Sequence, residues 1–357
     1  MIEGNLLEID GSFGEGGGAI LRLGAAYSVL FKCPIRIKNI RANRPKPGLR
    51  LQHLLGLKIL SEVSNSVLSP CGMGSEDISL TPNPTDDVKS KIQLNVSTAA
   101  SIGLLLQPIQ IASLTFRKPE KIEILIKGGG TFGKWAPSIN YLKEVTYALF
   151  ERSGLKINVD IMKHGFYPKG GALLKCEIYP SKDIIRPINL LELGNIDLIQ
   201  GEIVITNNLK RAKDNIGSRI RKSIKQQLRR KVRFETDIKY TWVDSISPGV
   251  GVSLWAKSDT GAIISTGTFL GEKKLSSEKL GSIVAQELLN YIQNNIPVDK
   301  YLSDQLIPLM GFVKKPSSIK VSEITSHTHT NLELIKLFTN REYKISDYQN
   351  HSIISYQ

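Results

Sequence analysis

Apolar residues along this chain follow helical and strand spacings in an order that recurs. Over residues 6–85, alternating apolar runs typical of strands flank stretches with apolar residues every three or four positions, which are typical of helices. Residues 90–180 show the same order of patterns, in which residues 137–154 are predicted to form the second helix. The first run predicts a strand at 6–10, a helix at 18–31, a strand at 34–41, a helix at 49–64 and short strands at 66–70 and 77–82.

A third run of the same kind is interrupted. It begins at 186–193 and resumes with helical patterns at 276–293 and 300–312, then 317–324, 331–338, 342–348 and 351–356. The block between these two parts contains several runs of alternating apolar and polar residues and one helical pattern. Together they predict a small α+β domain. A period of roughly 90 residues is too long for a solenoid. We therefore predict an α/β (α+β) fold with three repeated βαβαββ units in residues 1–184 plus 276–357, and an insert domain in residues 185–275.

The insert contains a strongly basic segment. Residues 210–233 hold eleven Lys or Arg and one Asp, a net +10 within a chain total of +14. Ile216, Ile220, Ile224 and Leu228 recur every fourth residue, which predicts an amphipathic helix with one buried stripe. Its basic face either interacts only with solvent or follows RNA phosphates, and the absence of interleaved aromatic residues leaves both interpretations open.

Composition narrows the class of protein. With 357 residues and a sequence pI near 9.5, the chain has room for about two domains and favours a polyanionic partner such as RNA. Three scattered cysteines without a C-x-x-C pair indicate neither a disulfide framework nor a thiolate zinc site. The first residues lack a basic and apolar leader, and no apolar run approaches the ~18 residues that span a bilayer. We expect a soluble, cytoplasmic protein without a membrane partner.

Two glycine-rich segments are candidates for phosphate binding. The segment Asp10–Arg22 lies between the first strand and helix, where backbone amides form an anion site and Glu15 is available for a metal, although a tight glycine turn is the alternative. The segment "KGGGTFGKW" at 127–135 nearly matches a nucleotide-binding loop, but Trp135 stands where a magnesium-binding hydroxyl is needed. We interpret this second segment as the glycine-rich end of a strand.

A basic loop follows the second predicted strand. Arg41, Arg44, Lys46 and Arg50 cluster around two prolines. Guanidinium groups match phosphate oxygens, and the prolines reduce the entropy that the loop loses on binding. A phosphate clamp and a solvated basic loop are both consistent with this composition.

Two histidines lie near the predicted start of the 331–338 helix. Thr330 and Glu333 have the spacing of a capping box, so we expect His327 and His329 just before the helix N-terminus, where an anion is favoured. A phosphoramidate on histidine would be stabilised there. In an extended segment the two rings point to opposite sides, so one is expected to face a pocket, and no third metal ligand is evident nearby. Ordinary polar loop residues are the alternative.

The motifs together resemble one family. In this order they are similar to RNA 3'-terminal phosphate cyclases: "DGSFGEGGGAILR", "IRANRPKPGLRLQH", "KHGFYPKGG", "YLSDQL" and "SHTHTN". The resemblance covers essentially the whole chain. It implies three βαβαββ repeats like the C-terminal domain of translation initiation factor three, with an insert in the third. It also implies ATP-dependent conversion of an RNA 3'-phosphate to a 2',3'-cyclic phosphodiester, with release of AMP and pyrophosphate and a divalent metal ion, Mg or Mn.

The resemblance also assigns roles to residues. His327 matches the histidine that forms a covalent histidine-AMP intermediate, and Glu15 resembles a carboxylate near the metal and ATP. Further ATP contacts are implied for Gln107, Tyr301, Leu302, Ser303, Asp304 and Gln305. The implied phosphate-binding set is Arg22, Arg41, Arg44 and Gln52. Lys134 and Trp135 depart from the family pattern. Two rival hypotheses are a non-catalytic relative, against which His327 argues, and a general RNA-binding protein that uses the basic insert.

Overall fold

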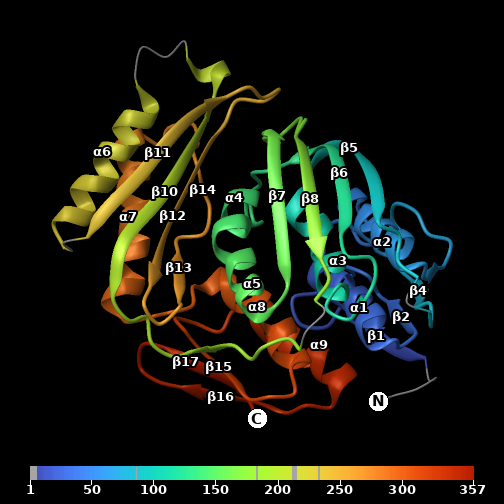
Figure 1. The fold of residues 1–357 in the computed structure, drawn as a ribbon. Coiled ribbons are helices and arrows are strands. Elements are labelled where there is room, and N and C mark those ends of the chain that lie inside the picture. Colours follow the sequence, from blue (N-terminus) through green and yellow to red (C-terminus); the bar gives the residue numbers. More distant parts are fainter. Residues whose placement is uncertain (1–5, 86, 182–183, 211–214, 232–233) are drawn as a thin grey trace.

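The computed structural model describes residues 6–85, 87–181, 184–210, 215–231 and 234–357 (Figure 1). Helices and sheets alternate through the chain, so the predicted mixed α/β class is confirmed. Residues 211–214 and 232–233, which belong to the predicted basic segment, lie outside the described residues. Among the described helices, none has the length and apolar character needed to cross a bilayer.

Three four-stranded sheets share one strand order. In each, the first strand pairs in parallel with the second, the second is antiparallel to the fourth, and the third is antiparallel to the fourth. The first unit comprises β1 (Leu7–Asp10), α1 (Gly18–Phe31), β2 (Ile35–Lys38), α2 (Leu51–Ser64), β3 (Val67–Leu68) and β4 (Ile78–Thr81). The second comprises β5 (Lys91–Ser101), α3 (Ile102–Ala112), β6 (Ile122–Gly130), α4 (Ile139–Tyr141), α5 (Tyr147–Ser153), β7 (Lys156–Lys163) and β8 (Leu173–Tyr179). The third comprises β9 (Asn189–Leu190), α8 (Lys300–Phe312), β15 (Ser317–Val321), α9 (Ser326–Thr339), β16 (Tyr343–Asp347) and β17 (Ser352–Tyr356).

The helices of the three units meet in a common interior. Helix α1 packs against α3 and α9, and α8 packs against α9, so each unit contributes a helix to this region (Figure 1). Nearly all of α1 is buried, as expected for a helix that is apolar on every side. Each sheet turns its alternate apolar residues toward these helices, as Ile35 and Ile37 of β2 do. The N-termini of α1, α8 and α9 are thereby held by one rigid core.

The second helix of the second unit is not regular. The pattern at 137–154 predicted one helix, whereas the structure has α4, a π-helical turn over Leu142–Thr146, and α5. Ser138 caps its start by accepting a hydrogen bond from the backbone amide of Tyr141. A π-turn shifts the following side chains around the helix axis, and such turns are frequent at functional sites.

The insert forms a five-stranded sheet covered by two helices (Figure 1). Its elements are β10 (Ile196–Thr206), α6 (Ile216–Arg229), β11 (Glu235–Val243), β12 (Val250–Ser258), β13 (Ile263–Ser265), β14 (Phe269–Leu270) and α7 (Ser277–Gln293). Ile220, Ile224 and Leu228 are buried and Ile216 is half-buried, which confirms the amphipathic basic helix. Helix α7 packs on α6 and β12, although its pattern suggested a helix of the third unit. The domain division at residues 185–275 stays a prediction, and this packing favours extending the insert through α7.

The contact between α6 and α7 depends on a glycine. A Cβ on Gly281 of α7 would lie 2.6 Å from the carbonyl oxygen of Ile220 on α6. We expect Gly281→Val to lower the free energy of unfolding by about 1–3 kcal/mol, because the helices must separate to accommodate the side chain. Urea unfolding followed by circular dichroism measures this. The matched control, Gln286→Val on the exposed face of α7, should change stability far less. Equal midpoints for the two variants would contradict the tight crossing.

Candidate active site

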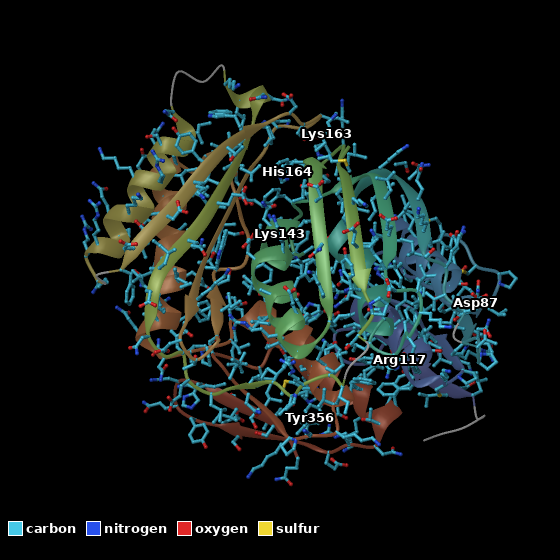
Figure 2. The ribbon with its side chains drawn as sticks, in the orientation of Figure 1. Asp87, Arg117, Lys143, Lys163, His164 and Tyr356 are labelled. Atoms are coloured by element: carbon cyan, nitrogen blue, oxygen red, sulfur yellow. The ribbon has the colours of Figure 1, made fainter. Side chains whose placement is uncertain are left out.

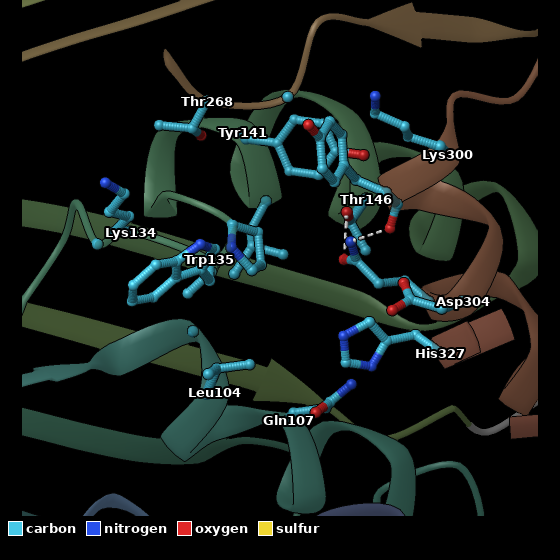
Figure 3. Close-up of a pocket in the computed structure, with 18 of the residues that line it drawn as sticks. Leu104, Gln107, Lys134, Trp135, Tyr141, Thr146, Thr268, Lys300, Asp304 and His327 are labelled. Carbon is cyan, nitrogen blue, oxygen red and sulfur yellow. Dashed lines mark hydrogen bonds between the residues drawn. The ribbon is translucent and has the colours of Figure 1, made fainter. Parts of the chain in front are cut away.

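A cavity of about 620 Å³ opens between the three units and the insert (Figure 3). This volume lies within the range of small-molecule binding sites, about 300–1,000 Å³. One side is largely apolar, with Leu104, Tyr141 and Phe269 among its residues. The other side carries polar and charged groups from α1, α3, α8 and α9, namely Arg22, Gln107, Asp304, Gln305, His327 and Asn331. Such a site can hold a ligand with one apolar and one charged end.

His327 lies in the first turn of α9 and lines the cavity. Helix α9 begins at Ser326 with Thr325 as its N-cap, because the Thr325 side chain accepts a hydrogen bond from the Thr328 amide. The predicted cap at Thr330 is therefore wrong. Thr330 is buried inside the helix, where its hydroxyl donates to the Ser326 carbonyl. His327 still lies at the positive end of the helix dipole, close to the free amides.

The second histidine does not share this site. His329 is exposed and lies outside the set of residues that line the cavity. The extended segment expected for the pair is wrong, because both residues lie in α9. Helical geometry turns successive residues by about 100°, so rings two positions apart still face different directions. Only His327 faces the cavity, and the expectation of a single inward histidine is confirmed.

Glu15 holds the ring of His327. The Nε2 atom of His327 lies 3.2 Å from Oε2 of Glu15, which is only 10% exposed. This hydrogen bond raises the pKa of His327; burial opposes the shift, and the negative charges of Glu15 and Asp304 add to it. Burial alone would raise the pKa of the Glu15 carboxyl, but His327 and Arg44 together bring it below its usual value. The imidazole therefore retains a proton in the resting site to a higher pH than a free histidine.

Two further charged groups complete this end of the cavity. Burial raises the pKa of Asp304 to about 6, although the positive charges of His327 and Arg22 oppose the shift. The buried guanidinium of Arg22 donates from Nε to Oε1 of Gln107 at 2.9 Å, and burial lowers its pKa to about 10. Arg22 thus remains a cation near neutral pH. The cavity end combines two cationic groups with two carboxyl groups and can accept an additional anion.

The glycine-rich segment brings α1 close to this cluster. A Cβ on Gly18 would lie 2.4 Å from Nε2 of His53 and 2.7 Å from Nη1 of Arg22, so a larger residue has no room there. Burial, assisted by the charges of Arg22, Arg41 and Arg50, lowers the pKa of His53 to about 3. His53 is consequently a neutral imidazole. Sequence reasoning did not single it out, although it lies next to the predicted Gln52.

The predicted phosphate-binding residues divide into different positions. Arg22 lines the cavity, and Arg44 lies 3.4 Å from Oε2 of Glu15. Arg41 instead turns back on its own loop, where its Nη1 donates to the carbonyl oxygens of Lys46 and Gly48. The side-chain nitrogen of Gln52 lies 3.4 Å from Nε2 of His53. Arg41 therefore shapes the loop in this structure, while Arg22 and Arg44 surround the Glu15–His327 pair.

The predicted nucleotide-binding residues of α8 also divide. Tyr301, Asp304 and Gln305 line the cavity with Gln107 of α3. Leu302 and Ser303 are fully buried on the other side of α8, where Ser303 Oγ lies 3.0 Å from Thr328 Oγ1 of α9. Residues one and two positions apart on a helix face different ways, which explains the split. Leu302 and Ser303 hold α8 against α9.

Several lining residues were missed by sequence reasoning. Asn331, one helical turn after His327, is buried and donates from Nδ2 to the Asp304 carbonyl, while its Oδ1 has no partner among the described residues. Thr146, the last residue of the π-turn, donates to Oε1 of Gln305 at 2.7 Å (Figure 3). The i, i+4 spacing from His327 is a signal that could have identified Asn331. Thr146 depends on an irregular helix and has no comparable signal.

The described residues contain no group of three or more His, Cys, Asp or Glu side chains arranged to hold a metal ion. Glu15 offers one buried carboxylate beside the cationic groups. Mg²⁺ is often held by one or two carboxylates together with phosphate oxygens of the substrate. Glu15 fits a site of this kind but not a cage built from protein ligands alone.

Comparison with known proteins agrees with this arrangement. The family model described as RNA 3'-terminal phosphate cyclase matches residues 13–345. A protein of that name from Pyrococcus abyssi is 35% identical over 340 residues, covering 95% of each chain. Those from Thermococcus kodakarensis and Methanopyrus kandleri are 34% and 30% identical over 339 residues, covering 95% and 94% of this chain and 94% and 93% of theirs. The chain therefore belongs to the RNA 3'-terminal phosphate cyclase family.

Proposed function

We propose that this protein is an ATP-dependent RNA 3'-terminal phosphate cyclase that acts through a histidine-AMP intermediate. The observation that carries the proposal is the position of His327, whose ring faces the cavity from the first turn of α9 and is held at Nε2 by Glu15. An imidazole nucleophile needs an orienting partner and a positive environment for phosphate oxygens. Glu15, Arg22 and the helix N-terminus supply these.

The chemistry explains why ATP is needed. A phosphate monoester lacks a good leaving group, so its own cyclisation is slow. Attack of the neutral His327 imidazole on the α-phosphorus of ATP forms an N–P bond and releases pyrophosphate. The 3'-phosphate of RNA then takes AMP from the histidine to form a mixed anhydride. Attack of the vicinal 2'-hydroxyl closes the cyclic phosphodiester, and AMP leaves. A neutral imidazole is both a capable nucleophile and a good leaving group.

Different residues of the site have different roles in the proposed reaction. Glu15 orients the ring of His327 by accepting a hydrogen bond from its Nε2–H. Arg22 and Arg44 offset the negative charge of phosphate groups. The apolar side, with Tyr301, Leu104 and Phe269, accommodates the adenine. When a divalent ion such as Mg²⁺ or Mn²⁺ is bound at Glu15, it supplies further compensation of phosphate charge.

The raised pKa of His327 predicts a pH profile. Since only the neutral imidazole attacks, the rate of self-adenylation should rise with pH through an inflection above 6.5, the ordinary value for histidine. Glu15→Gln removes the carboxylate that raises this pKa, so the inflection should move to lower pH. Single-turnover transfer of labelled AMP from ATP, from about pH 5 to about pH 9, measures both profiles.

A remote carboxylate is the control for this shift. Glu62→Gln removes an exposed partner of Lys89, and its profile should coincide with that of the parent. The Glu15 variant will also react more slowly if Glu15 helps to bind a metal, but a loss of rate alone leaves the inflection in place. Superimposable inflections for the parent and the Glu15 variant would contradict the proposed pairing.

A further inference from the structure

Two large aromatic side chains stand in solvent beside the cavity. Trp135 is 91% exposed and Tyr167 is 77% exposed. They lie on the loops that follow β6 and β7, and the second of these loops carries the "KHGFYPKGG" motif, which the site described above does not use. Because these rings are exposed, burial of their apolar surface does not stabilise the fold. Exposed aromatic rings on two loops of the same unit therefore point to a binding surface.

The two loops are fixed to each other. The amide of Thr131 donates to the carbonyl of Gly165 at 2.9 Å, and Thr131 Oγ1 lies 3.0 Å from Nδ1 of His164. The rings of Phe132 and Phe166 stack with centroids 4.8 Å apart and planes 10° from parallel. Both phenylalanines are buried. Trp135 and Tyr167 are thus presented from one rigid base, which limits the entropy lost when a ligand binds.

Lysines accompany both rings. Lys134 precedes Trp135, and its Nζ lies 5.3 Å from the centre of the indole ring and 3.2 Å from Glu272. Lys163 and Lys169 are exposed on either side of Tyr167. Figure 2 shows Lys163 at the end of β7, near the insert. Aromatic rings interleaved with cations suit single-stranded nucleic acid, whose bases stack and whose phosphates pair with lysine. The basic helix α6 lacks such interleaved rings.

The rings of Trp135 and Tyr167 differ in their position relative to the cavity. Trp135 lines the side opposite His327 (Figure 3), whereas Tyr167 is outside the set of lining residues. We propose that Trp135 and Tyr167 stack on bases of single-stranded RNA that lie 5' to its terminal phosphate, with Lys163 and Lys169 contacting the backbone. This inference rests on the proposed function, since it assumes that the RNA end enters the cavity.

The binding of ATP does not account for both rings. ATP carries one base, and the cavity already offers it Tyr301 and an apolar side. Tyr167, outside the cavity, has no role toward a nucleotide bound there. The basic face of α6 is a different candidate for RNA, but no residue of α6 lines the cavity, and Arg219 is paired with Glu278 at 2.7 Å. In contrast, RNA bound at Trp135 and Tyr167 can extend into the cavity, where its 3'-phosphate reacts.

The test compares substrates of two lengths. One is a decanucleotide and the other a dinucleotide, both ending in a 3'-phosphate, and only the longer one reaches Tyr167. We expect Tyr167→Ala to lower kcat/KM for the decanucleotide by about tenfold, the loss expected for one base–aromatic stack, while the value for the dinucleotide stays at that of the parent. Trp135→Ala should lower decanucleotide affinity, measured by fluorescence anisotropy, by a similar factor. Tyr167→Ala, which lies outside the cavity, should retain self-adenylation by ATP.

Matched control variants test whether loss of base stacking causes the weaker reaction with the decanucleotide. Tyr167→Phe keeps an aromatic face and should restore most of the loss, and Tyr348→Ala removes a 56% exposed tyrosine of the third unit and should change nothing. Parent-like decanucleotide affinity in both alanine variants would overturn the inference. An equal loss of self-adenylation and RNA affinity in Trp135→Ala would also overturn it, by assigning the indole to ATP. Anisotropy needs no turnover, so RNA binding through Tyr167 without AMP transfer would support the surface and contradict only the proposed function.

Discussion

Replacing His327 with alanine should abolish the transfer of AMP from ATP to the protein. Among the described residues on the charged side of the cavity, His327 is the best-placed nucleophile for the proposed covalent bond, because Asp304 is buried and Asn331 is an amide. We expect labelling to fall by at least about a thousandfold, because loss of a covalent nucleophile removes the whole reaction path. Incubation with ATP labelled at the α-phosphate, followed by denaturing electrophoresis, measures protein-linked AMP.

The chemistry of the label and a neighbouring histidine provide the controls. A phosphoramidate is lost in acid and kept in base, so the label on the parent protein should show this behaviour. His329→Ala changes an exposed residue two positions away on the same helix, so it should at most reduce labelling. Undiminished labelling in the His327 variant would rule out this histidine as the site of attachment, whatever the remaining activity with RNA.

The apolar pattern predicted the elements well where one face of each is buried. Strands such as β2 alternate buried and half-buried residues, and α1 is apolar throughout, so both leave a strong local signal. The start of α9 was misjudged because Thr325 and Thr330 are both possible caps, and only tertiary packing buries Thr330. The packing of α7 on α6 and β12 could not be predicted, because the pattern of α7 indicates a helix but not the partner on which it packs.

The arrangement of the charged site was harder to predict from the sequence than the helices and strands. Positions such as His327, Gln107 and Asp304 came from resemblance to a family, and the structure brings their side chains to one cavity. The 3.2 Å contact between Glu15 and His327 joins residues more than 300 positions apart, which no local pattern encodes. Arg41 is a further example, since the sequence of a basic loop does not indicate that its guanidinium bonds two carbonyl groups of the same loop.

The protein should convert ATP to AMP in the presence of an RNA that ends in a 3'-phosphate, but not in the presence of the same RNA with a 3'-hydroxyl end. The proposed reaction needs a phosphate oxygen to take AMP from the histidine, and a 3'-hydroxyl supplies no oxygen of comparable charge for the cationic end formed by Arg22 and Arg44. We expect a difference of at least about a hundredfold in AMP release, the size of effect seen when a charged group that a site is built to bind is missing. Release of AMP from labelled ATP in the presence of each RNA measures it.

A 2'-deoxy terminus separates activation from ring closure. An RNA whose last sugar lacks the 2'-hydroxyl can still accept AMP on its 3'-phosphate, but the nucleophile that closes the ring is missing, so adenylated RNA should accumulate and no cyclic end should form. Thin-layer or gel separation of end-labelled RNA distinguishes the adenylated, cyclic and unreacted forms. The Tyr348→Ala variant, changed far from the cavity, should give the same products as the parent. Equal ATP turnover with the 3'-hydroxyl RNA would instead indicate a ligase-like enzyme, since AMP would then be spent on an end that cannot cyclise.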